Sequence, residues 1–83
     1  MSLVDPEMVA CMLAKPPSTA APARIADWLE RKAALHERLA AVASNQLEAA
    51  SLREVAWNAR SDARIQRRIA DTDGTRGLRP AAG

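Results

Sequence analysis

The chain has 83 residues, a formal net charge of +2 and an apolar content of 48%, which together allow one small domain. Nineteen of its 40 apolar residues are alanine, whereas Leu, Ile and Val together number 15, and Phe and Tyr are absent. Small domains bury a low fraction of their surface and often depend on a second copy or a partner. Because alanine is the strongest helix former, the composition predicts an all-α protein with a thin hydrophobic core.

Few side chains in the sequence are suited to catalysis or metal binding. Cys11 and His36 are the only soft metal ligands, and neither a CxxC nor an HxxxH spacing is present. All three glycines follow residue 73, which excludes a glycine-rich phosphate loop in the body of the chain. A single cysteine also cannot form an intrachain disulfide. We therefore expect no enzymatic activity, no cofactor and no metal site.

The first thirteen residues, MSLVDPEMVACML, do not have the pattern of a targeting segment. They contain no basic residue, and Asp5 and Glu7 interrupt an apolar run that is too short to span a bilayer. We therefore expect a cytoplasmic protein that does not bind membranes.

Residues 1–15 are predicted to contain a short amphipathic helix that begins near Pro6. Asp5 is a helix-capping residue type, and Pro6 suits the first helical position because its missing N–H costs nothing there. The helix is expected to end at about Lys15, since a residue before proline is disfavoured in the α region. Residues 16–23, PPSTAAPA, are predicted to form a proline-stiffened linker. One side of the helix is an apolar patch suited to a partner protein: Met8, Val9, Met12 and Leu13.

Residues 24–73 contain no proline or glycine and are compatible with helix throughout. Apolar residues between Ile25 and Val42 recur at alternating three- and four-residue spacings, which is typical of a helix in a bundle. The opposite, solvent-facing side carries charged residues: Asp27, Glu30, Arg31, Glu37 and Arg38. On this side, Asp27 and Arg31 are expected to form an ion pair one turn apart. The apolar side, with two residues of the following segment, is the predicted oligomer core: Ile25, Trp28, Leu35, Leu39, Val42, Leu52 and Val55.

Two arrangements are open for residues 24–73. In the first, Ser44-Asn45 is a tight connection, and Asn45 with Glu48 forms a capping box that opens a second helix, which gives a helical hairpin. In the second, one helix of about fifty residues runs straight through and is about 75 Å long. A helix of this length would need a coiled-coil partner to cover its apolar side, but the heptad pattern lasts for under three heptads. We favour the hairpin.

The segment of about residues 46–72 has two different sides when it is drawn as a helix. One half combines alanines with larger aliphatics such as Ile65 and Ile69, and it is predicted to face the core. The other half carries Trp57 within an arc of five arginines: Arg53, Arg60, Arg64, Arg67 and Arg68. Residues 51–83 hold seven arginines against four acidic residues, so the positive charge of the chain is concentrated here.

Trp57 has three interpretations. Its ring packs between the helices of an assembly while arginines stack on its edge. Alternatively, it anchors another protein, since Trp and Arg dominate the energetics of interfaces. In the third interpretation, the ring stacks on an unpaired base while the arginines neutralise phosphates. A net charge of +2 is modest for a nucleic-acid-binding protein, and no glycine turn precedes this helix as in a helix-turn-helix.

The remaining features have simple interpretations. Asp73-Gly74 is a plausible helix end, and residues 74–83 are predicted to form a disordered tail. Cys11 is expected to behave as a small apolar side chain, and His36 as a half-buried surface residue. Lys32 lies on the apolar stripe, where its alkyl stem is expected to pass along the edge of the core. The alternative is that Lys32 specifies the register or the oligomeric state, as polar residues at such positions do.

The sequence thus predicts a short N-terminal helix, a linker and a helical hairpin that forms a dimeric helical bundle. The expected function is a non-catalytic protein–protein interaction or assembly module that acts as a homo-oligomer and contacts another protein. The alternative is a non-specific nucleic-acid-binding accessory protein that uses the arginine side of the C-terminal helix.

Overall fold

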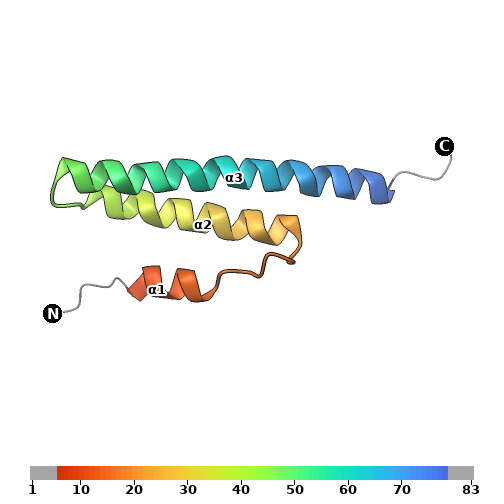
Figure 1. Ribbon diagram of the computed structural model, residues 1–83, viewed down its shortest axis with the longest axis horizontal. Coiled ribbons are helices and arrows are strands. Elements are labelled where there is room, and N and C mark those ends of the chain that lie inside the picture. Colours follow the sequence, from red (N-terminus) through yellow and green to blue (C-terminus); the bar gives the residue numbers. More distant parts are fainter. Residues whose placement is uncertain (1–5, 79–83) are drawn as a thin grey trace.

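The computed structural model describes the backbone of residues 6–78 and the side chains of residues 6–72. Three helices make up this part of the chain: α1 (Pro6–Leu13), α2 (Pro22–Ala41) and α3 (Gln46–Leu78). They lie side by side in one layer, with α2 between α1 and α3, and the molecule measures 61 × 23 × 15 Å (Figure 1). The described residues contain no strand, so the predicted all-α class is confirmed.

The connection between α2 and α3 turns the chain back within four residues. Asn45 caps α3, because its Oδ1 accepts a hydrogen bond of 2.8 Å from the backbone N–H of Glu48. The Ser44 hydroxyl donates a 3.1 Å hydrogen bond to the Glu48 carboxylate and closes the other side of this turn. The structure therefore contains the hairpin expected at Ser44-Asn45, and the single long helix is wrong (Figure 1).

The interface between α2 and α3 consists mainly of alanine. On both helices a buried alanine recurs every seventh residue, which brings it back to nearly the same side after two turns. Small side chains let the two backbones approach closely, and Leu29 packs against the centre of this contact. The two series are Ala26, Ala33 and Ala40 on α2, and Ala49, Ala56 and Ala63 on α3.

This packing corrects the predicted orientation of α3. The alanine-lined side of the helix faces α2, whereas Leu47, Ile65 and Ile69 are exposed. The physical reason is that two closely spaced helices cover only a narrow arc of each other, and the buried residues of α3 in that arc are all alanine. Larger aliphatics farther from this arc, such as Ile65 and Ile69, stay open to solvent.

Helix α1 is held against α2 by a small cluster of larger side chains. Cys11, Trp28 and Leu35 are buried together, and Met8 packs against them. The indole Nε1 of Trp28 donates a 2.8 Å hydrogen bond to the carbonyl oxygen of Cys11 and so joins the two helices. An ion pair of 2.6 Å between Glu7 and Arg38 adds a second tie at the start of α1.

The C-terminal end of α3 differs from the expectation. The helix continues to Leu78 and does not end at Asp73-Gly74. The helix includes two glycines, Gly74 and Gly77, and each costs only about 1 kcal/mol relative to alanine, so neither by itself stops a long helix. Pro80 is a stronger signal, because proline disfavours the α region for the residue before it. The last five residues of the predicted tail, 79–83, lie outside the described residues.

Candidate functional site

The sequence singled out one surface of α3, the arginine–tryptophan face, which comprises Arg53, Trp57, Arg60, Arg64, Arg67 and Arg68. The structure divides this face into two parts. Two of its arginines reach across to carboxylates of α2 and stabilise the hairpin. The remaining three arginines and the indole ring lie on the outer side of the helix.

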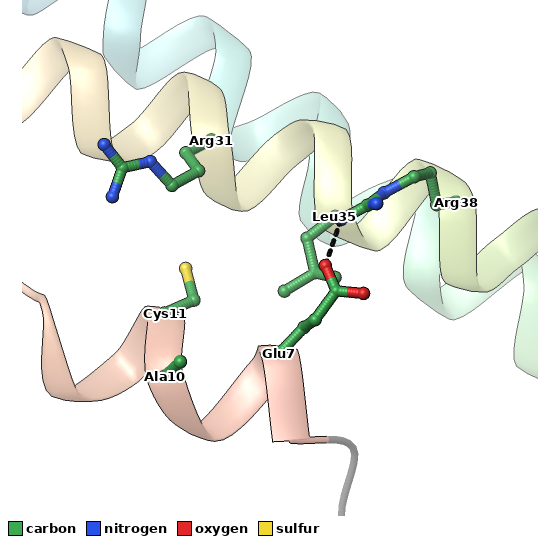
Figure 2. Close-up of a pocket in the computed structure, with 6 residues that line it drawn as sticks. All are labelled: Glu7, Ala10, Cys11, Arg31, Leu35 and Arg38. Atoms are coloured by element: carbon green, nitrogen blue, oxygen red, sulfur yellow. Dashed lines mark hydrogen bonds and ion pairs between the residues drawn. The ribbon is translucent and has the colours of Figure 1, made fainter.

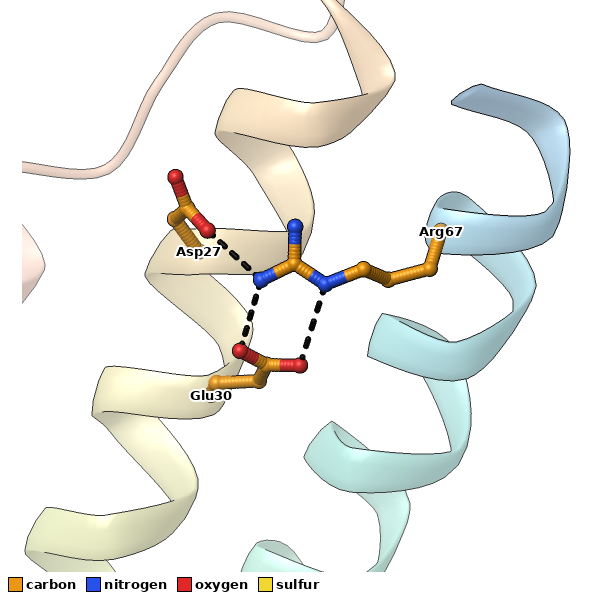
Figure 3. Close-up of polar contacts among 3 residues, drawn as sticks. All are labelled: Asp27, Glu30 and Arg67. Atoms are coloured by element: carbon orange, nitrogen blue, oxygen red, sulfur yellow. Dashed lines mark hydrogen bonds and ion pairs between the residues drawn. The ribbon is translucent and has the colours of Figure 1, made fainter. Parts of the chain in front are cut away.

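Arg67 lies between two carboxylates that are one turn apart on α2 (Figure 3). Its guanidinium donates hydrogen bonds of 2.6 Å to Asp27 and of 2.7 and 3.3 Å to Glu30. The hydrogen bond from Arg67 holds the pKa of Glu30 below its usual range, and the two carboxylates raise the pKa of Arg67. Asp27 therefore pairs across the hairpin with Arg67, and the ion pair expected with Arg31 is wrong.

Arg60 makes the same kind of contact two turns earlier on α3. Its Nε and Nη2 donate hydrogen bonds of 3.0 and 2.5 Å to the two carboxylate oxygens of Glu37. This fork-like pairing lowers the pKa of Glu37 and raises the pKa of Arg60. Both arginines of the hairpin are thus already paired, and neither is available to bind a separate anion without losing this contact.

The outer part of the face is open to solvent. The Trp57 side chain is 65% exposed, and the Arg64 guanidinium lies 5.9 Å from the centroid of its ring. The side chains of Arg53 and Arg68 are also exposed. A single copy of the chain leaves this indole uncovered, so a buried position for Trp57 requires another molecule.

The predicted oligomer core does not form one surface. Trp28 and Leu35 are buried inside the copy by α1, whereas Val42 directly follows α2 and is 78% exposed. The remaining members are half-buried or marginally exposed: Ile25, Leu39, Leu52 and Val55. The sequence pattern placed Trp28 and Leu35 on the apolar side of α2, but it contained no information on where α1 would pack.

The predicted partner patch on α1 is also divided. Met8 packs against the cluster around Trp28. Cys11, which lies among the patch residues in the sequence, is the buried residue of α1. Val9, Met12 and Leu13 are exposed, with Leu13 at 82%. These three side chains keep an apolar surface on α1 that a second molecule can contact.

Two of the shallow cavities in the described part of the chain are lined by α1 or by the residues that follow it. One, of about 220 Å³, lies between α1 and α2, where the Cys11 thiol points toward α2 and Glu7 pairs with Arg38 (Figure 2). The other, of about 440 Å³, contains the Trp28 ring, with the ammonium groups of Lys15 and Lys32 at 5.9 and 5.3 Å from its centroid. Among the described residues, no group of three or more His, Cys, Asp or Glu is placed to hold a metal ion.

His36 is more buried than the sequence suggested. Its Nδ1 lies 2.8 Å from the carbonyl oxygen of Lys32, and since a carbonyl only accepts, Nδ1 carries the hydrogen. The ring is therefore fixed to its own helix. The Lys32 side chain is half-buried, as expected for a residue at the edge of the core, and its ammonium group lies over the Trp28 ring.

The sequence reasoning missed the acidic partners of the hairpin. Asp27, Glu30 and Glu37 were placed on the solvent side of their helix, and the structure pairs them with α3. One signal was available: Glu30 and Glu37 are seven residues apart, as are Arg60 and Arg67. Matching heptad spacings of opposite charge on two antiparallel helices indicate interhelical ion pairs.

Comparisons with protein-family models, curated proteins and solved structures return no match for this chain. A search of the described helices finds none that combines the length and the apolar character of a membrane span.

Proposed function

We propose that this protein is a non-catalytic helical module that self-associates and joins other proteins. The observation that carries the proposal is the distribution of its apolar side chains. Seven of the ten buried apolar residues in the described part are alanine, and no large side chain there is fully buried. Nine larger apolar side chains are exposed in the same part of the chain, Trp57 among them.

The energetics favour association over an isolated hairpin. Burial of a large aliphatic or aromatic side chain contributes about 1.5–3 kcal/mol, and an alanine methyl contributes much less. The hairpin thus gains little from its own interior, while Trp57, Ile65 and Ile69 remain available to be covered. A second copy or another protein that covers them would add the burial of large apolar side chains, which the alanine interface lacks.

The paired arginines argue for a protein partner over nucleic acid. Arg60 and Arg67 already contact three carboxylates, and those carboxylates would repel a phosphate backbone that ran along this side. Only Arg53, Arg64 and Arg68 of the face stay free of such ion pairs among the described residues. Trp with Arg at an exposed position is also the combination that dominates protein interfaces.

Sedimentation velocity of the whole chain over a micromolar concentration series tests the proposal. We expect a dimer or a larger assembly whose population grows with concentration. A monomer at every concentration would contradict self-association. Titration with a labelled oligonucleotide at two salt concentrations provides the comparison, because phosphate neutralisation weakens steeply as salt rises. Tight, salt-dependent binding would favour the nucleic-acid alternative.

A further inference from the structure

Five residues of α3 form an outer stripe: Glu54, Trp57, Ser61, Ile65 and Arg68. Their spacings are three, four, four and three residues, so at about 100° per residue they lie within an arc of roughly 80°. Ser61 is partly exposed and the other four are exposed. The stripe lies away from the alanine series of α3, which faces α2.

The outer stripe is symmetric about Ser61 in position and complementary in chemistry. Seven residues before Ser61 is an acid, Glu54, and seven residues after it is a base, Arg68. Four residues before it is Trp57 and four residues after it is Ile65, both large and apolar. A twofold axis through Ser61 would therefore bring each residue of one copy to its chemical complement in the other.

We propose that two copies of the chain pair through the outer stripe as antiparallel α3 helices, with the twofold axis at Ser61. This inference rests on the proposed self-association and names the surface that performs it. Glu54 of each copy pairs with Arg68 of the other, and Trp57 of each copy packs on Ile65 of the other. The small side chain of Ser61 lets the helices approach closely at the axis.

Charge decides the direction of pairing. A parallel, in-register pair would place Glu54 opposite Glu54 and Arg68 opposite Arg68, which is repulsive at both positions. The antiparallel pair makes both contacts attractive. These two charges cannot satisfy each other within one copy, because fourteen residues of helix separate them by about 21 Å. No ion pair to either side chain is present among the described residues.

The apolar part of the contact supplies its affinity. Trp57 and Ile65 are 65% and 53% exposed, and each copy contributes both, so the pairing covers four large side chains. The ring of Trp57 is already held from one side by Arg64 of its own helix. A ring that is partly ordered before binding loses less side-chain entropy when it is covered.

The decisive experiment measures the dimer dissociation constant of three charge variants by sedimentation equilibrium. E54R and R68E should each weaken the dimer by roughly 5- to 30-fold, because each reverses two ion pairs per dimer. The double variant E54R/R68E should return the dissociation constant to near the wild-type value, since it restores both pairs with exchanged signs. A double variant no tighter than the single variants would overturn the proposed pairing.

Controls separate this inference from the proposed function. Arg24→Glu makes the same charge change as R68E at an exposed position of α2, and it should leave the dissociation constant unchanged. Trp57→Ala should weaken the dimer by at least about tenfold while circular dichroism keeps the helix content. If the wild type associates and none of these stripe variants alters it, the interface is wrong and self-association stands. If the wild type is monomeric, both fail.

Discussion

Trp28 and Trp57, the two tryptophans of this chain, have opposite environments. Trp28 is 7% exposed, packs with Cys11 and Leu35, and donates its indole N–H to a backbone carbonyl. Trp57 is open and contacts only an arginine of its own helix among the described contacts. The position of Trp28 on the apolar side of a helix predicted its burial, but the hydrogen-bond partner required knowledge of where α1 lies.

Trp28→Phe is expected to loosen α1 without unfolding the hairpin. The phenyl ring keeps most of the apolar contact, while the lost hydrogen bond to Cys11 costs about 1 kcal/mol. Amide hydrogen exchange should therefore accelerate roughly fivefold in residues 8–13 and stay unchanged around Ala59. Trp57→Phe is the matched control, because it changes an exposed ring. Equal acceleration in both variants would show that the indole N–H does not hold α1.

At the scale of the elements, the alanine heptads determine how α2 and α3 meet. Their close contact also positions Glu30 and Glu37 within reach of Arg67 and Arg60 on the same edge of the hairpin. A bulky residue in either alanine series would separate the helices and lengthen these ion pairs.

Ala56→Leu should destabilise the hairpin markedly. Ala56 is 1% exposed against Ala33 of the facing helix, so a larger side chain must push the backbones apart. Overpacking of this kind costs about 1–3 kcal/mol. Urea unfolding followed by circular dichroism measures the change, and Ala50→Leu at an exposed position of the same helix should leave the midpoint nearly unaltered. Two variants of equal stability would contradict the close alanine contact.

Prediction at this scale succeeded where local chemistry decides and failed where it does not. The turn at Ser44-Asn45 was predictable because Asn45 can cap the next helix through its own side chain. The orientation of α3 was not, because alanine carries so weak an apolar signal that the larger Ile65 and Ile69 outweighed it on the helical wheel. Two backbones can approach closely only where the side chains between them are small. A pattern based on hydrophobicity alone does not take side-chain size into account.

For the whole molecule, the interhelical ion pairs link stability to pH. Hydrogen bonds from Arg67 and Arg60 lower the pKa values of Glu30 and Glu37 from the ordinary value of 4.5. A carboxylate with a lowered pKa in the folded state stabilises that state above its unfolded pKa. The contribution is lost as the pH falls through the folded pKa, where the group binds a proton in both states. The screening of these exposed groups by solvent keeps the effect modest.

The urea midpoint should therefore fall between about pH 5 and pH 3, and it should be nearly flat between about pH 6 and pH 8. The double variant Glu30→Gln/Glu37→Gln should lose part of this acid dependence, because its amides do not titrate. The difference between the two curves isolates the ion pairs from the other carboxylates of the chain. Parallel curves for the two proteins would show that these pairs contribute nothing to stability.

The sequence by itself determined the helical class, the hairpin connection and the scarcity of large core side chains, since these follow from propensity, capping and composition. The tertiary structure decided which arginines are used within the copy and which face outward. That division depends on the rotation of α3 about its axis, and the alanine contact with α2 sets this rotation. The arginine–tryptophan face is therefore divided. Arg60 and Arg67 close the hairpin, and the other side chains of the face stay available to another molecule.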